Sequence, residues 1–351
     1  MKPLESVKFC GVVKPNFSDV NSYLTTSFNR GKLSNFGWCY EAFQSRLQYR
    51  WFNSWCRSSV IVSSAHTALM AAYSVLEIKR PIMPAYTFRS TYVAATIQGI
   101  EPLLVDVDRD TGCLTPEIIK SIDPATYDSV VVVCSLSVIP ELQAINELCK
   151  ELDKKLIIDA APCFGTEGIY SYGDAVCVSF HATKSFPLGE GGVVIAHPNI
   201  CKRVKEYVNF GFDNIKHITG SGINAKVSEY TCAIGLSLLD IIEEPINRRL
   251  LNAELYKTRL GNLTPKSSIN NTVYQSFPVF MKTEEQANLL VDQLDKNNIE
   301  SVKYYKPIVD MPNTTSLYKR NVCLPIHHQL SKNTLDTIID IVRSVDDGSV
   351  R

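Results

Sequence analysis

The sequence predicts an α/β fold with a mostly parallel central sheet, flanking helices and a smaller C-terminal α+β domain. Between about residues 58 and 196, short apolar runs without polar alternation are separated by amphipathic helical stretches. Strands that are apolar at every position are typical of parallel sheets, which are buried on both faces. The chain has 351 residues, which is enough for one large domain and a smaller one. We expect a large domain at 1–240, including an N-terminal arm, and a small domain at 241–351.

The expected strands of the large domain are short runs rich in valine and isoleucine. They lie at residues 60–62, 81–83, 102–105, 130–134, 156–158, 176–178 and 193–195. Helical stretches between some of these strands lie at residues 67–76, 91–98 and 141–152. Because functional residues of such sheets follow the carboxyl ends of strands, we expect cofactor-binding and catalytic side chains directly after these runs.

A change of pattern marks the expected start of the small domain. A helical stretch at 228–244 is followed by a charged segment at 247–249. Beyond it, the pattern predicts a strand at 273–281 and helices near 283–297 and 331–342.

Composition and charge exclude several classes of partner. Lys+Arg and Asp+Glu each total 36, so the formal net charge is zero, and we expect neither nucleic acid nor an anionic membrane as a partner. The 11 cysteines are scattered without a C-x-x-C pair, which predicts reduced thiols in the cytoplasm, with no zinc site and no disulfide framework. No apolar run reaches membrane-spanning length, and residues 1–13 lack the apolar core of a signal peptide.

One segment carries most of the chemical information. Residues 179–192 have the sequence Ser-Phe-His-Ala-Thr-Lys-Ser-Phe-Pro-Leu-Gly-Glu-Gly-Gly, which sets Lys184 between Ser179 and a glycine-rich turn. Upstream, Asp159 ends the apolar run at 156–158. A lysine that forms an imine and an aspartate that faces a pyridinium nitrogen are the pair with which proteins hold pyridoxal phosphate. An isolated lysine is more often part of a polar surface turn. The residues around Lys184 therefore decide whether it is a cofactor lysine or a surface lysine.

A phosphate cradle is expected between the first strand and its helix. Residues 63–67 (Ser-Ser-Ala-His-Thr) lie there, and backbone amides at a helix N-terminus bind anions. The hydroxyl of Ser179 is a further donor. Phe88 follows another short strand, where it could place an aromatic face on the cofactor ring. A serine-rich N-cap without a ligand and an aromatic residue in the core explain the same positions.

Five segments follow one another in an order that is known from one protein family. They are 84–88 (Pro-Ala-Tyr-Thr-Phe), 105–108 (Val-Asp-Val-Asp), the lysine segment 179–192, 222–229 (Gly-Ile-Asn-Ala-Lys-Val-Ser-Glu) and 324–331, which begins Leu-Pro-Ile-His. In type and spacing they resemble the DegT/DnrJ/EryC1/StrS sugar aminotransferases, which have the fold-type-I architecture of pyridoxal-phosphate enzymes. The resemblance covers most of the chain and is strongest from 60 to 236.

The resemblance implies a cofactor and its main contacts. The cofactor is pyridoxal 5′-phosphate, with Lys184 as the Schiff-base lysine and Asp159 as the partner of the ring nitrogen. It also implies Phe88 against the cofactor ring.

The phosphate contacts implied by the resemblance come from two subunits. The backbone amides of Ala65 and His66 and the hydroxyl of Ser179 would bind the phosphate of their own subunit. Asn224 would reach the phosphate of the neighbouring subunit, because active sites of the family form at a dimer interface. A homodimer with shared active sites is therefore expected.

Three features depart from the family's pattern. His66 replaces a threonine, so an imidazole stands where the family has a hydroxyl. Pro162 replaces a glutamine whose side chain bonds to the cofactor's ring oxygen, so that bond is lost or supplied from elsewhere. The chain is also somewhat short for the family, which would trim substrate loops.

We therefore expect an aminotransferase that moves an amino group from glutamate to a nucleotide-linked 6-deoxy-keto sugar, for amino-sugar and O-antigen polysaccharide synthesis. The expected nucleotide is dTDP or UDP, and C4 is favoured over C3 as the aminated carbon. Lys184 would move a proton from the donor's α-carbon, first as base and then as acid. The segment 304–307 (Tyr-Tyr-Lys-Pro) would contact the sugar or merely pack.

Three other functions account for parts of this sequence. A regulatory or scaffold homologue that binds the cofactor without turnover is compatible with Pro162 and His66. A pyridoxal-phosphate-dependent sugar dehydratase is disfavoured, because such relatives as a rule replace the lysine that is present here as Lys184. A nicotinamide dehydrogenase is disfavoured because no G-x-G-x-x-G motif follows the first strand.

Overall fold

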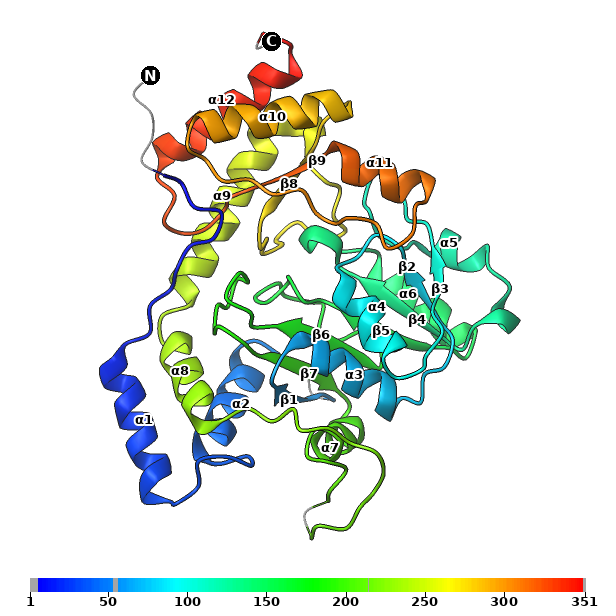
Figure 1. Ribbon diagram of the computed structural model, residues 1–351, viewed down its shortest axis with the longest axis vertical. Helices are drawn as coiled ribbons and strands as arrows, with labels where there is room; N and C mark the ends of the chain where they lie inside the picture. The colour runs from blue at the N-terminus through cyan, green and yellow to red at the C-terminus, as the bar shows by residue number, and fades with distance from the viewer. Residues whose placement is uncertain (1–5, 53–55, 214, 350–351) are drawn as a thin grey trace.

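The computed structural model describes residues 6–52, 56–213 and 215–349, so part of the N-terminal segment judged for a signal peptide, residues 1–5, lies outside it. Its centre is a seven-stranded sheet with the strand order β1-β7-β6-β5-β4-β2-β3 (Figure 1). The strands are β1 (Ser58–Val62), β2 (Pro81–Pro84), β3 (Leu103–Val105), β4 (Ser129–Val133), β5 (Lys155–Asp159), β6 (Ala175–Ser179) and β7 (Gly192–Ala196). Each lies within a few residues of a run predicted from the sequence.

Strand direction gathers the carboxyl ends of six strands at one edge of the sheet. β2, β3, β4, β5 and β6 pair in parallel, whereas β7 is antiparallel to both of its neighbours, β6 and β1. Because β1 and β6 both oppose β7, β1 points in the same direction as the parallel strands. The predicted α/β fold with a mostly parallel central sheet is confirmed.

Helices cover both faces of this sheet, which explains why its strands show no polar alternation. Ile61, Val130 and Ile158 belong to the apolar core on one face, and Val131 and Ile157 belong to the core on the other. The helices of the first face are α2 (Trp38–Arg50), α5 (Pro116–Lys120), α6 (Leu142–Glu151) and α8 (Glu229–Leu239), and those of the second are α3 (Ala65–Val75), α4 (Arg89–Thr96) and α7 (Pro198–Tyr207). α1 (Phe17–Asn29) packs against α8 at the outer side.

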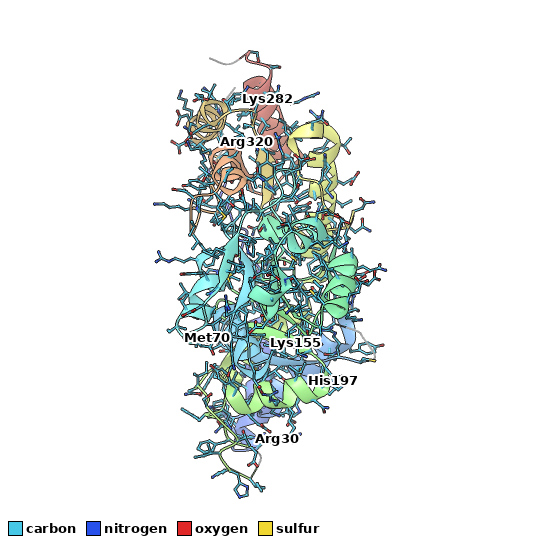
Figure 2. The ribbon with its side chains drawn as sticks, turned by 90° about the vertical axis from the view of Figure 1, so that its right-hand side faces the viewer. Arg30, Met70, Lys155, His197, Lys282 and Arg320 are labelled. Carbon is cyan, nitrogen blue, oxygen red and sulfur yellow. The ribbon has the colours of Figure 1, made fainter. Side chains whose placement is uncertain are left out.

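A second unit lies beyond the carboxyl edge of the large sheet (Figure 1). Its antiparallel strands are β8 (Phe277–Phe280) and β9 (Asn321–Leu324), and its helices are α9 (Glu243–Leu260), α10 (Glu284–Lys296), α11 (Pro312–Arg320) and α12 (Lys332–Asp346). Within the part of the chain that the structure describes, short 3₁₀ turns lie at Pro124–Thr126, Ser135–Ser137 and Gly261–Leu263. In Figure 2, Lys282 and Arg320 of this unit lie at one end of the molecule and Arg30, which follows α1, lies at the other.

The small unit has its own apolar core, and the N-terminal segment joins it. Val7 is part of that core, and its backbone exchanges hydrogen bonds with Asn298 and Glu300 at 2.8 and 2.9 Å. The predicted strand at 273–281 is shorter in the structure, because only 277–280 pair with β9. The division at residue 240 stays a prediction. No helix among the described residues is long and apolar enough to cross a bilayer.

Candidate active site

A cavity of about 310 Å³ opens at the carboxyl edge of the large sheet, where the small unit meets it. Its walls come from the loops after β1, β2, β4, β5 and β6 and from the segment that leads into β8. Six of the seven residues proposed from the sequence line this cavity: Ala65, His66, Phe88, Asp159, Ser179 and Lys184. They come from four separate parts of the chain, at or after the ends of β1, β2, β5 and β6, so only the fold brings them together.

Lys184 follows β6 and presents a partly buried amine to the cavity. Its Nζ donates a hydrogen bond to Oε1 of Gln275 at 2.6 Å. Burial lowers the pKa of Lys184 from its ordinary value, and the charge of Asp159 opposes that shift. A lowered pKa increases the neutral fraction of the amine near neutral pH, and the neutral form is the one that attacks an aldehyde.

Asp159 ends β5 with its carboxylate almost fully buried, the residue being 4% exposed. Within the described part of the chain, the hydrogen bonds to this carboxylate come from neutral donors: Thr91 Oγ1 at 2.7 Å and the backbone N–H of Ala161 at 3.0 Å. Burial raises the pKa of Asp159, although these bonds and the charge of Lys184 oppose the shift. A buried carboxylate beside a cavity with neutral donors has room for a cationic partner, such as a protonated ring nitrogen.

The expected phosphate cradle is the N-terminus of α3. Ser64 is its N-cap, and the Oγ of Ser64 accepts from the N–H of Thr67 at 3.2 Å. The backbone at the start of the helix lies against Gly192, where an added Cβ would stand 2.5 Å from the carbonyl carbon of Ser64 and 2.6 Å from the nitrogen of Ala65. The last glycine of the lysine segment, Gly192, is therefore required by this close approach. First-turn amides of an 11-residue helix next to a cavity are suited to an anion.

Two side chains extend the cradle. Ser179 is buried, and its Oγ accepts from the backbone N–H of His181 at 3.2 Å, which leaves its own hydroxyl proton for another acceptor. Nδ1 of His66 lies 2.8 Å from Oγ of Ser90. The imidazole that departs from the family's pattern is thus held in place by a hydroxyl at the start of α4.

Aromatic side chains form the outer wall of the cavity. Phe88 is 59% exposed and its ring centroid lies 6.1 Å from that of Tyr305, which also lines the cavity. The hydroxyl of Tyr86 donates to the backbone oxygen of Tyr304 at 2.6 Å and so ties the loop after β2 to the small unit. The sequence left open whether the segment 304–307 contacts a ligand or packs, and the structure places both tyrosines in the wall.

Two side chains that hydrogen-bond to the central pair, Asp159 and Lys184, were not predicted from the sequence. Thr91 lies on the helix after the Phe88 segment, and its polar position on an otherwise buried face was a usable signal. Gln275 lies 91 residues after Lys184, and no local pattern marks it. Pro162, which replaces the family's glutamine, lines the cavity close after Asp159. The side-chain amide beside Lys184 is that of Gln275.

Asn224, the seventh proposed residue, lies outside this cavity. It is exposed, and its Oδ1 accepts from Nζ of Lys226 at 2.7 Å. Its expected contact with a neighbouring subunit stays a prediction.

The residues of the cavity fit pyridoxal phosphate. The buried carboxylate of Asp159 suits its ring nitrogen, the amides of α3 suit its phosphate, and Lys184 is an amine of lowered pKa for its aldehyde.

Residues 18–343 match the DegT/DnrJ/EryC1/StrS aminotransferase family. The chain belongs to this family. It is accordingly a pyridoxal-phosphate-dependent aminotransferase, which confirms the enzyme class and cofactor expected from the five segments.

Relatives of the family resemble the chain over most of its length. A dTDP-4-amino-4,6-dideoxy-D-glucose transaminase of Shigella dysenteriae is 28% identical over 307 residues, which cover 79% of this chain and 83% of the relative. The structure of NtdA from Bacillus subtilis with bound cofactor PMP superposes with a TM-score of 0.87 at 22% identity, and covers 99% of this chain and 86% of that one. The structure of DesI in the presence of its TDP-sugar product gives 0.84 at 24% identity, with coverage of 98% and 95%. These two structures share the fold of this chain.

Proposed function

We propose that this aminotransferase moves an amino group from glutamate to the ketone of a nucleotide-linked 6-deoxy sugar, with dTDP or UDP as the nucleotide and C4 favoured over C3. The observation that carries the proposal is the cavity, where Lys184, Asp159 and the N-terminus of α3 meet within about 310 Å³. The 28%-identical relative named for a dTDP-4-amino sugar supports the nucleotide and the carbon.

Each residue of the cavity has a separate role in the proposed reaction. When bound, pyridoxal phosphate supplies an electron sink for the carbon that loses its proton. Asp159 holds a proton on the ring nitrogen, because a buried carboxylate and a cation favour each other's charged forms. Lys184 Nζ is placed to take the proton from the donor's α-carbon as base and to return it as acid. The amides of Ala65 and His66, with the hydroxyl of Ser179, bind the phosphate and orient the ring.

The experiment is a panel of nucleotide keto-sugars, incubated with glutamate and the loaded enzyme, with products identified by mass spectrometry. We expect the ketone to become an amine for a dTDP or UDP 6-deoxy sugar. Lys184→Arg is the matched control, because it keeps the positive charge and removes the primary amine, and it should lose at least about 10²-fold in rate.

Each alternative function has its own outcome in the same panel. Loss of water from the sugar without gain of nitrogen would identify a dehydratase. A cofactor band that glutamate leaves unchanged would identify a binding protein without turnover. Transamination that persists in Lys184→Ala would contradict the role of Lys184.

A further inference from the structure

Gln275 lies at the amine that carries the proposed chemistry, although it comes from a distant part of the chain. Its Oε1 is 2.6 Å from Nζ of Lys184. Among the described residues that line the cavity, it is the only one with a side-chain amide. The residue is 9% exposed, so water competes little for this contact.

The backbone of Gln275 is held from both sides. Its N–H donates to Oγ of Ser137 at 3.1 Å, and its carbonyl oxygen accepts from Nη1 of Arg249 at 2.9 Å. The same Nη1 donates to the carbonyl oxygen of Tyr274 at 3.1 Å, so Arg249 binds two consecutive carbonyl groups. Arg249 itself is buried, and burial lowers its pKa to about 10.

The support for Gln275 continues to the strand that carries Asp159. Oγ of Ser137 donates to the carbonyl oxygen of Pro162 at 3.2 Å, three residues after that aspartate. Ser137 has a φ of +66°, a conformation that serine adopts rarely and at a free-energy cost. A strained backbone that joins the loops after β4 and β5 to Gln275 indicates that the position of this side chain is specified by the fold.

We propose that Gln275 is a positioning residue for Lys184: its amide oxygen accepts a hydrogen bond from Nζ, directs the amine within the cavity and stabilises its protonated form. The inference rests on the proposed function only in that Lys184 is the reacting amine. A neutral oxygen acceptor favours an ammonium over an amine less strongly than a carboxylate does, and more strongly than an alkyl group does. An alkyl replacement of Gln275 should therefore lower the pKa of Lys184, and a carboxylate replacement should raise it.

Other groups also act on the charge of Lys184. These are Asp159, Cys163 and Cys10, whose negative forms raise the pKa of the lysine against the effect of burial. They are the same in every variant below, so differences between variants report the residue at position 275.

The test measures the protonation of Lys184 in the cofactor-free protein. Acetic anhydride acylates neutral amines, and the extent of acylation of the Lys184 peptide at graded pH, read by mass spectrometry, gives the midpoint of its titration. We expect the titration midpoint of Lys184 to be lowest in Gln275→Leu, intermediate in the wild type and highest in Gln275→Glu. At neutral pH, Lys184 of the leucine variant should be acylated about threefold or more faster than that of the wild type. Gln98→Leu removes an amide that follows α4 and is not among the residues that line the cavity, so it should leave the midpoint unchanged.

The outcomes of this test are distinct. Coincident midpoints, or a shift of the same sign in the leucine and glutamate variants, would overturn the proposal. Circular dichroism checks folding, and Gln275→Met, which is closest in length, replaces the leucine variant if that one unfolds. No substrate or cofactor enters the assay, so an error in the proposed sugar or donor leaves the expected order unchanged.

Discussion

Burial acts in opposite senses on the two ionisable residues at the centre of the cavity. It raises the pKa of Asp159 and lowers the pKa of Lys184, so each group is pushed toward its neutral form. For the lysine this is useful directly, because the neutral amine is the nucleophile. For the aspartate, burial destabilises the ionised carboxylate, and a cationic ring nitrogen would offset this effect. The buried carboxylate therefore favours the cofactor and lowers the stability of the cofactor-free protein.

Replacement of Asp159 by asparagine should separate function from stability. An asparagine keeps one oxygen, which can accept from the N–H of Ala161, and its NH2 group can donate to the hydroxyl oxygen of Thr91 in place of the bond that Thr91 now donates. It carries no charge to be buried. Because the folded state raises the pKa of Asp159, the ionised carboxylate destabilises the fold at neutral pH, and that effect disappears in the variant. We expect the melting temperature of the cofactor-free protein to rise by on the order of 1–3 °C, while transamination falls by about 10²–10³-fold.

Calorimetry of the cofactor-free variant and a rate assay of the loaded one check these two effects. The rise in melting temperature should vanish at pH values below the range in which Asp159 ionises, because the wild-type carboxyl is then also neutral. A variant that is less stable at neutral pH and fully active would contradict this account.

The residues of the site differ in how far the sequence reveals them. Lys184 and Asp159 could be predicted, because a lysine motif and a strand-end acid are local patterns. Gln275 could not, because its contact with Lys184 depends on how the small unit is packed against the large one. Thr91 lies between these cases, since its helix was predicted but its hydrogen bond to Asp159 was not.

At the scale of elements, the first residue of β7 must be a glycine, because the N-terminus of α3 lies against it. In Gly192→Ala the new Cβ would stand 2.5 Å from the backbone of Ser64, so the N-terminus of α3 must move. Overpacking of this kind costs about 1–3 kcal/mol, and we expect the melting temperature to fall by on the order of 5 °C. Fluorescence titration should show weaker binding of pyridoxal phosphate as well, because the displaced amides form the cradle.

The matched control for this glycine is Gly220→Ala. Gly220 has no neighbouring atom within 4 Å of an added Cβ, and its φ is not positive. This variant should melt like the wild type. Equal melting temperatures and cofactor affinities for both variants would show that the close approach at Gly192 is not required.

A single carboxylate connects the large sheet to helix α11. Asp106 follows β3, and its oxygens accept from the N–H groups of Asn313 and Thr314 at 2.8 and 2.9 Å, and from the hydroxyl of Thr314 at 2.8 Å. Burial raises the pKa of Asp106, but these hydrogen bonds outweigh it and the net shift is downward. The carboxylate thus acts as a cap supplied from another element of the fold.

The Asp106→Asn variant should lose about 1 kcal/mol in free energy of unfolding at neutral pH. A lowered folded-state pKa contributes stability above the ordinary pKa of an aspartate, and this contribution is lost as pH falls through the folded value. The difference between variant and wild type should therefore shrink in acid. Urea unfolding at graded pH measures it, with the exposed Asp310→Asn as control. A difference that grows toward acid would contradict the assignment.

Elements with a strong apolar pattern could be predicted, and several others could not. The buried strands and α3, α6, α10 and α12 agree with expectation within a few residues. Helices α1, α2, α5, α7 and α11, and strand β9, were not expected. Helix α2 mixes polar and apolar residues without a clear period, whereas α7 is amphipathic, with Cys201, Val204 and Tyr207 on its buried face, and its pattern was a usable signal. α9 begins at Glu243 and runs through the charged segment that had marked only a boundary. Asn247 and Arg248 lie on the solvated face of this helix, whereas Arg249 is buried.

At the scale of the whole molecule, a segment that begins at Phe210 and precedes Asn224 exposes large apolar side chains to solvent. Phe210 is 50% exposed and Ile218 is 76% exposed, and Phe212 pairs with Ile218 across the segment. Exposed apolar side chains that cluster in this way mark interaction surfaces. Together with the expected role of Asn224, they support a homodimer in which each subunit completes the site of the other.

Mixing of two inactive variants tests this arrangement. Lys184→Ala and Asn224→Ala subunits, unfolded together and refolded, should regain about a quarter of the wild-type activity, because half of randomly paired dimers are mixed and each has one intact site. Each variant refolded alone is the control and should stay inactive. An Asn224→Ala protein that is fully active by itself, or a mixture that regains nothing while light scattering shows mixed dimers, would contradict the shared site.

The sequence by itself determined the class of fold, the family and the central pair Lys184 and Asp159, because apolar runs and compact motifs depend only on neighbours along the chain. The tertiary structure decided what lies around them. It placed Gln275 on the amine, joined Asp106 to α11 and required Gly192 beneath the cradle. These contacts join residues that are far apart in the chain, and their partners are set by the packing of the small unit and the strand order of the sheet, which no local pattern encodes.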